Sequence, residues 1–125
     1  MSGINKVFLV GHLGKNPELK YLSDNVAMVS FPLATTEIIN KEGKKQEQTE
    51  WHNIVMWRAL AEAAAKILEK GRLIHLEGKL RTRSFEDKEG HKRYTTEIVV
   101  ESFTPLGRRS DFEEVDDLSL ATYNT

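Results

Sequence analysis

The chain has 125 residues, of which 39% are hydrophobic and 30% are charged, and it contains no cysteine. The length and composition predict one soluble domain. The absence of cysteine excludes disulfides, thiolate metal sites and a cysteine nucleophile. The sequence shows no secretory signal and no apolar run near the ~20 residues of a membrane span. The first 110 residues carry a net charge of +4 and the last fifteen carry −5, which favours a polyanion-binding body with a solvated acidic tail, although +4 is also ordinary for a domain of this size.

Three strands are predicted in the first half of the chain. Residues 6–11 form a short run rich in strand-forming side chains. Residues 26–36 alternate apolar and polar positions, and Pro32 among them must lie at an edge or a bulge because it has no N–H to donate. A polar stretch containing a glycine, residues 40–45, predicts a hairpin loop before the third strand at residues 50–57.

A change of period marks a single helix in the second half. Apolar side chains recur at helical spacing over residues 58–70, and Gly71 suits the left-handed position that follows a helix. Two further strands, residues 73–85 and 94–103, flank a polar hairpin loop at residues 86–90.

The expected order of elements is β-β-β-α-β-β, which is that of the OB-fold, a five-stranded Greek-key barrel that is all-β apart from one helix. We assign residues 1–106 to this domain and residues 107–125 to a flexible acidic tail, because the periodic spacing of apolar residues ends there. OB-folds commonly bind oligonucleotides or oligosaccharides, but a fold alone does not establish function.

Alternation along the strands separates a predicted binding face from a predicted core face. The core face of the third and fourth strands carries Ile54, Met56, Ile74, Leu76, Leu80 and Thr82. The outer face carries Trp51, Asn53, Val55, Trp57, Lys79, Arg81, Arg83 and Phe85. Aromatic rings beside cations suit single-stranded nucleic acid, because bases stack on the rings while the cations contact phosphates. Alternation alone leaves both tryptophans equally compatible with a place in the core.

No catalytic or metal site is predicted. The histidines, His12, His52, His75 and His91, are scattered and form no ligand pair of metalloenzyme spacing. Carboxylates within the strands, such as Glu50, Glu77 and Glu97, form no recognisable acid–base pair. The glycines of residues 11–14 have the spacing of a KH-domain clamp, but the order of elements differs from that fold, so we interpret them as a bend or turn.

Seven stretches of the sequence point together to one family. They are residues 5–11, 16–21, 33–35, 48–52, 70–71, 77–83 and 93–97. The most specific are Gln-Thr-Glu-Trp-His at 48–52 and Glu-Gly-Lys-Leu-Arg-Thr-Arg at 77–83. With these motifs, the chain resembles the bacterial single-stranded DNA-binding proteins of the replicative, homotetrameric type, from about residue 4 to residue 103.

The resemblance implies a function and a set of site residues. It implies sequence-tolerant binding of single-stranded DNA in replication, recombination and repair, by a cytoplasmic, nucleoid-associated homotetramer without cofactor, metal or membrane contact. The implied stacking residues are Trp51, Trp57 and Phe85. Positions that contact phosphates in the family match Lys6, Lys20, Arg81 and Arg83, and Lys79 lies beside them on the predicted outer face. His52 matches a position near the family's subunit contacts.

Two features depart from the family. A further family tryptophan falls at Ile38 or Ile39, which cannot stack as an aromatic ring does. The family's terminal proline and phenylalanine, which dock on replication and repair proteins, have no match in residues 118–125. Either the chain is a shorter family member or its natural end is missing, and replication and repair proteins stay candidate partners. A related OB module of a primosome or for single-stranded RNA is the second hypothesis, and an enzyme is the third.

Overall fold

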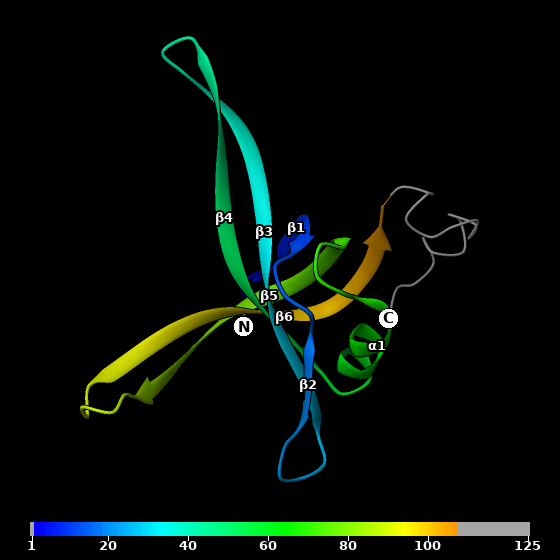
Figure 1. Cartoon of the computed structure of the whole chain (residues 1–125). Helices are drawn as coiled ribbons and strands as arrows, with labels where there is room; N and C mark the ends of the chain where they lie inside the picture. Colours follow the sequence, from blue (N-terminus) through cyan, green and yellow to red (C-terminus); the bar gives the residue numbers. More distant parts are fainter. Residues whose placement is uncertain (1, 108–125) are drawn as a thin grey trace.

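Six strands and one helix make up the part of the chain that the computed structural model describes, residues 2–107 (Figure 1). They are β1 (Val7–Leu13), β2 (Glu18–Tyr21), β3 (Ala27–Lys41), β4 (Lys44–Trp57), α1 (Ala59–Ile67), β5 (Leu73–Glu86) and β6 (Lys92–Leu106). The strands form one sheet in the order β1-β5-β6-β4-β3-β2, and a further pairing of β1 with β3 closes it. The predicted OB-type barrel is confirmed. The expected acidic tail lies outside the described residues, apart from Gly107.

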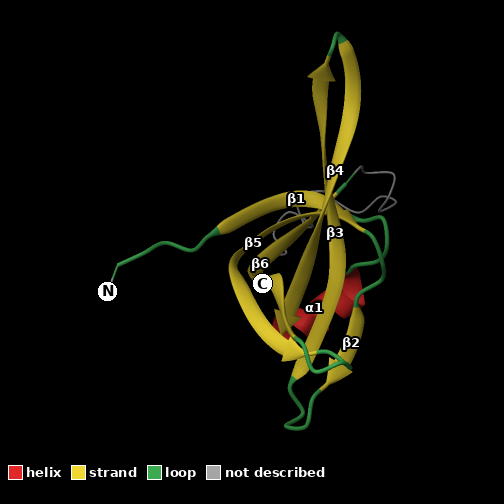
Figure 2. Ribbon diagram, turned by 90° about the vertical axis from the view of Figure 1, so that its left-hand side faces the viewer, coloured by secondary structure: helices red, strands yellow, loops and turns green. Residues whose placement is uncertain are grey.

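The core follows from the alternation along the strands. In β3 the buried positions are Ala27, Val29, Phe31 and Leu33. In α1 the two alanines Ala61 and Ala64 are fully buried, and their small side chains let the helix pack closely against β2, β3 and β4 (Figure 2). Within residues 2–107, no helix has the length and apolar character needed to cross a membrane.

Pro32 lies where β3 changes its partner. The neighbours of β3 on that edge are β2, paired with residues 27–30, and β1, paired with residues 33–34. The carbonyl of Pro32 accepts a hydrogen bond of 2.8 Å from the Gly14 N–H, so its nitrogen faces the same side, between the two partners. The missing donor therefore costs no ladder hydrogen bond, and the prediction of an edge position holds.

Several local predictions differ from the structure. The loop expected at residues 40–45 is a two-residue turn, because β3 continues to Lys41 and β4 begins at Lys44. Strand β2 was missed, because all four of its residues are exposed and it has no apolar alternation to reveal it. The helix is shorter than expected, since it ends at Ile67 and the next residue, Leu68, turns to an extended conformation and is buried. Gly71 does have a positive φ of 89°, but within the turn that follows, where Arg72 N–H bonds the carbonyl of Glu69 at 3.0 Å.

Two hairpins extend beyond the barrel as separate arms (Figure 1). The β3–β4 arm turns at Glu42 and Gly43, both with positive φ, which matches the twist of a tight hairpin. The β5–β6 arm contains residues 79–86 of β5 and the residues 92–99 paired with them, and its strands remain paired to Glu86 opposite Lys92. Leu80 and Thr82, predicted on the inner face, are exposed because this part of β5 has left the barrel wall.

Candidate nucleic-acid interface

A groove of about 590 Å³ crosses the outer face of the barrel over β3, β4, β6 and β5. Its lining includes Asn53 and Trp57 from β4, Arg81 and Arg83 from β5, and Glu97 from β6. These side chains come from three strands: β5 and β6 form one hairpin, whereas β4 is separated from both in the sequence and meets β6 only in the fold. The groove therefore depends on strand register.

The register explains how the outer faces of these strands become continuous. In the β3–β4 hairpin, Pro32 lies opposite Asn53. The parallel pairing of β4 with β6 places Val55 beside Val99, and the antiparallel β5–β6 pairing places Lys79 opposite Val99. Directly paired residues point to the same side of a sheet, so the aromatic side chains of β4 and the cations of β5 share one face, as alternation predicts.

The two tryptophans differ in their surroundings. Trp51 is 59% exposed, whereas Trp57 is half-buried in the wall of the groove together with Met28 and Arg81. Both belong to the outer face, and neither belongs to the hydrophobic core. The alternative that they are core residues is thereby wrong for Trp51, which presents most of its ring to solvent.

The indole ring of Trp51 packs directly against the backbone of Gly14. A Cβ atom at Gly14 would lie 2.5 Å from Cζ3 of Trp51 and 3.2 Å from Cγ of Pro32, so only a glycine lets the indole lie this close to the backbone. Gly11 in turn passes against the carbonyl of Ala34, where a side chain would also clash. The two glycines of this stretch serve close packing rather than phosphate binding.

Arg81 and Arg83 hold one carboxylate between them. Glu97 Oε1 lies 3.3 Å from Nη2 of Arg81, and its Oε2 lies 3.2 Å from Nε of Arg83. The carboxylate of Glu97 is buried, while 46% and 58% of the two arginine side chains remain accessible. Sequence reasoning missed this contact, because it regarded Glu97 only as one of several acids within strands.

The predicted lysines do not gather as a group. Lys20 in β2 lies opposite Met28, on the side that Trp57 occupies, and Lys79 lies on β5 two residues before Arg81. These two lysines extend the positive charge at either end of the groove.

Lys6 lies elsewhere and is already paired. Its ammonium donates to Glu101 Oε1 at 3.1 Å and is 3.7 Å from Glu77, at a bulge where Glu101 has no partner in β5. The hydrogen bond to Glu101 and the charges of both acids raise the pKa of Lys6. The structure thus provides a protein partner for this lysine, and a phosphate would have to compete with it.

The β5–β6 arm carries an exposed aromatic ring on each face. Phe85 is 45% exposed and lies opposite Arg93, on the face that continues from Arg83. Tyr94, on the other face, is 67% exposed, and Nζ of Lys92 lies 5.9 Å from its ring centre. Sequence reasoning gave Tyr94 no role, although it follows two cations, Lys92 and Arg93, in a predicted strand.

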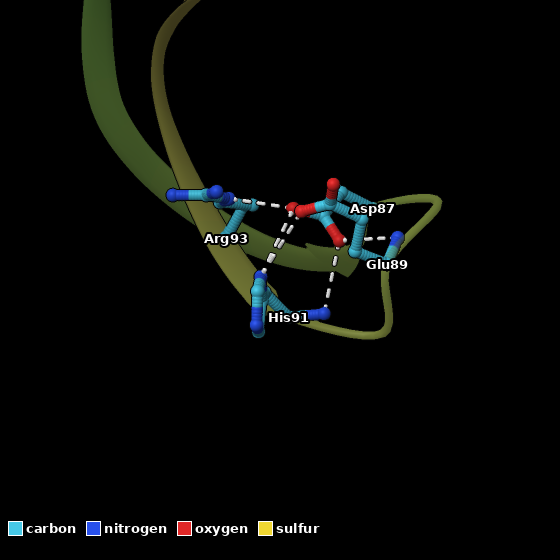
Figure 3. A network of polar contacts seen from close by, with 4 residues as sticks. All are labelled: Asp87, Glu89, His91 and Arg93. Atoms are coloured by element: carbon cyan, nitrogen blue, oxygen red, sulfur yellow. Dashed lines mark hydrogen bonds and ion pairs between the residues drawn. The ribbon is translucent and has the colours of Figure 1, made fainter.

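The loop at the tip of this arm is organised by Asp87 (Figure 3). Its carboxylate accepts hydrogen bonds of 2.9 Å from the backbone N–H groups of Glu89 and His91, and one of 2.8 Å from Nε of Arg93. These contacts, with that of Arg93 the strongest, hold the pKa of Asp87 below its usual value.

The same loop brings together three groups of the kind that ligate metals. Ligand atoms of Asp87, Glu89 and His91 lie within 4.8 Å of one another, although the sequence left His91 isolated. The Arg93 guanidinium already neutralises Asp87 in this arrangement (Figure 3). We therefore assign these groups to the stability of the loop.

His52 lies on a different surface. Its Nε2 shares a hydrogen bond of 2.9 Å with Oγ1 of Thr35, and both residues line a hollow beside Phe8 and Val10 of β1. Phe8 and Val10 are 61% and 51% exposed. We call Phe8, Val10, Thr35 and His52 the β1 face; it presents two exposed apolar side chains beside polar ones, and Phe8 and Val10 have no partner covering them within residues 2–107.

Comparisons with known proteins agree on one family. Residues 4–106 match the Single-strand binding protein family. The chain is 42% identical over 117 residues to "Single-stranded DNA-binding protein 1" of Xylella fastidiosa, covering 92% of this chain and 86% of that protein. It is 44% identical over 119 residues to the protein of the same name from Chlorobaculum tepidum, covering 94% of this chain and 74% of the relative.

Solved structures show the same barrel. The Plasmodium falciparum SSB in complex with ssDNA has a TM-score of 0.79 and 27% identity, over 86% of this chain and 98% of that one. A deletion mutant of the single-stranded DNA-binding protein from Thermus aquaticus has a TM-score of 0.75 and 32% identity, and the match covers 86% of this chain and 53% of that one.

Proposed function

The chain belongs to the single-strand binding protein family, and from this premise we propose that it coats single-stranded DNA with little sequence preference. The observation that carries the proposal is the groove in which Trp57 lies with Arg81 and Arg83, together with the exposed ring of Trp51 on the same face of β4. Rings that any base can stack on, beside cations that any phosphate can contact, favour binding without readout of base edges.

The strand would follow the face from the barrel onto the β5–β6 arm. Trp57 and the two arginines offer a stacking platform and phosphate contacts in the groove, and Phe85 continues the same face outward. Trp51, seated on Gly14, offers a second platform further along β4. Lys20 and Lys79 would contact phosphates at the margins, and Lys6 only after leaving its acidic partners.

Assembly and cellular role form a further part of the proposal. The β1 face is an exposed apolar surface, and such surfaces commonly mark protein–protein contacts. We assign it to contact between copies of this chain in a homotetramer, with His52 near that contact. The protein would then act by binding rather than by catalysis, in replication, recombination and repair of cytoplasmic, nucleoid-associated DNA.

Competition between nucleic acids tests the proposed function. Binding should quench tryptophan emission, because bases would stack on Trp51 and Trp57. Labelled single-stranded DNA should be displaced by unlabelled single strands of any sequence, and far less by duplex DNA, whose bases are unavailable for stacking. Preferential displacement by RNA would support the RNA-module alternative instead. Failure of single-stranded DNA to quench or compete would contradict the proposal.

A further inference from the structure

A buried carboxylate lies in the middle of a groove that would bind a polyanion. Glu97 is 6% exposed and is the one buried charged residue among residues 2–107. Its charge would repel phosphates, and the two cations best placed to attract them are partly neutralised by it. A carboxylate in this position is therefore expected to contribute to binding in a way that outweighs its repulsion of the phosphates.

The geometry of the contact suggests that role. Strand register places Arg81 directly opposite Glu97 and Arg83 opposite Thr95, so the carboxylate lies between two neighbouring guanidinium groups. Each carboxylate oxygen contacts a different arginine, at 3.3 Å and 3.2 Å. A guanidinium has five N–H donors, so most of each fork stays available to a ligand.

We propose that Glu97 is a positioning residue of the DNA groove, which holds Arg81 and Arg83 in their binding orientation before the strand arrives. Long side chains lose rotamer freedom when a ligand immobilises them, and a contact that orders them beforehand reduces this loss. The inference rests on the proposed function, because it concerns the contacts of that same groove.

Salt separates the two opposing effects of Glu97. The repulsion between its carboxylate and DNA phosphates is Coulombic and fades as the Debye length falls to ~3 Å at 1 M salt. The ion pairs that order the two arginines are also Coulombic, but the Glu97 carboxylate is buried, so salt screens them much less. A variant that loses the carboxylate should therefore show its binding defect most clearly at high salt.

The experiment compares two removals of one negative charge from the same groove. Glu97→Gln keeps the side-chain shape but lacks the charge that holds both arginines. Glu18→Gln is the matched control, because Glu18 also lines the groove and no ion pair within residues 2–107 involves it. Affinity for an oligothymidylate would be measured by tryptophan quenching from ~0.1 to ~1 M salt.

We expect different responses from the two variants. Glu18→Gln should bind slightly more tightly than the natural chain at low salt and equally at high salt. Glu97→Gln should bind about tenfold more weakly at high salt, because two long side chains are no longer ordered before binding. At low salt the defect should be smaller, because the variant also loses the repulsion between the carboxylate and the phosphates. Parallel curves for the two variants would overturn the proposal, since the carboxylate would then act only as a charge.

A second variant guards against a general loss of structure. Glu97→Asp keeps the charge but is one methylene too short to span both arginines, so positioning predicts weaker binding at every salt concentration. In an Arg81→Ala/Arg83→Ala background, Glu97→Asp should have no further effect. A defect that persists there would assign Glu97 a structural role and overturn the proposal. If the natural chain itself did not bind, the proposed function would fail instead.

Discussion

Trp51 is highly exposed, yet its ring packs against the backbone of Gly14. Its ring is 59% exposed and lies against Gly14, outside the hydrophobic core. We expect Trp51→Ala to weaken binding of single-stranded DNA by roughly 1–3 kcal/mol, the usual value of one stacking platform. Titration of an oligonucleotide measures the loss, and thermal melting should show an almost unchanged fold. An unfolded variant, or one with undiminished affinity, would contradict the stacking role.

Gly14 is expected to act on DNA only through Trp51. Its substitution by alanine places a Cβ 2.5 Å from Cζ3 of the indole, which must then shift. Gly14→Ala should therefore weaken binding by part of the ~1–3 kcal/mol attributed to stacking. A double-mutant cycle measures this coupling: once Trp51 is alanine, the change at Gly14 should cost almost nothing. Additive effects would show that Gly14 contributes to binding by another route.

At the scale of the element, the β5–β6 arm depends on its tip. The carboxylate of Asp87 accepts hydrogen bonds from two backbone N–H groups and from Arg93, which closes the loop (Figure 3). Beyond the barrel the arm has no core beneath it, and its residues from Lys79 to Glu86 are all exposed. Local polar contacts thus contribute more to its order than they would inside the barrel.

This arrangement makes the order of the loop dependent on pH. The folded-state pKa of Asp87 lies below its ordinary value of 3.8, so the carboxylate stabilises the loop fully above that pH and ceases to do so as the pH falls below it. Amide resonances of Glu89 and His91 should shift together in that acidic window. In Asp87→Ala the two amides should have disordered-loop shifts at every pH.

Glu89→Gln serves as the control for the loop, because the Glu89 side chain contacts only His91, at 3.6 Å, within the network. It should leave the acid transition of the Asp87 contacts in place. If the amide shifts of the natural chain did not change below pH 3.8, the assigned role of Asp87 in closing the loop would be wrong.

At the scale of the whole molecule, the β1 face should be covered by another copy of the chain. Light scattering of the natural protein should give about four times 14.3 kDa. Val10, 51% exposed in the single chain, would be desolvated in such an assembly, so Val10→Lys should shift the mass towards smaller species. The barrel itself should still fold, since Val10 does not belong to its core.

Ile38→Lys is the matched control for this prediction. Ile38 is even more exposed, at 67%, and lies on the β3–β4 arm outside the lining of the hollow beside Phe8 and Val10. It should leave the mass unchanged. A natural protein that is monomeric at micromolar concentration, or a Val10→Lys variant with an unchanged mass, would show that the β1 face is not the contact between copies.

Much of the barrel could be predicted because its signals are local. Alternation in residues 26–36 and 50–57 sorted Phe31 and Ile54 into the core and Trp51 onto the outer face, since successive side chains of a strand point in opposite directions. The missing donor of Pro32 predicted an edge or a bulge, and the structure places it where β3 changes its strand partner. The helix was found from its period, although its end was not, because burial of Leu68 decided that point.

Sequence alone therefore determined the class of fold and the family, and it grouped Trp51 with Arg81 and Arg83 on one face, but the exposure of Trp51 came from the structure. Tertiary structure alone decided which side chains meet. The packing of Trp51 on Gly14 and the pairing of Lys6 with acids join distant segments, and the contact of Glu97 with two arginines depends on the register of one hairpin. Such contacts depend on strand register. The bulge at Glu101 adds one unpaired residue to β6, so every later residue of β6 lies on the opposite face from the one that simple alternation predicts. No local sequence pattern reveals this shift.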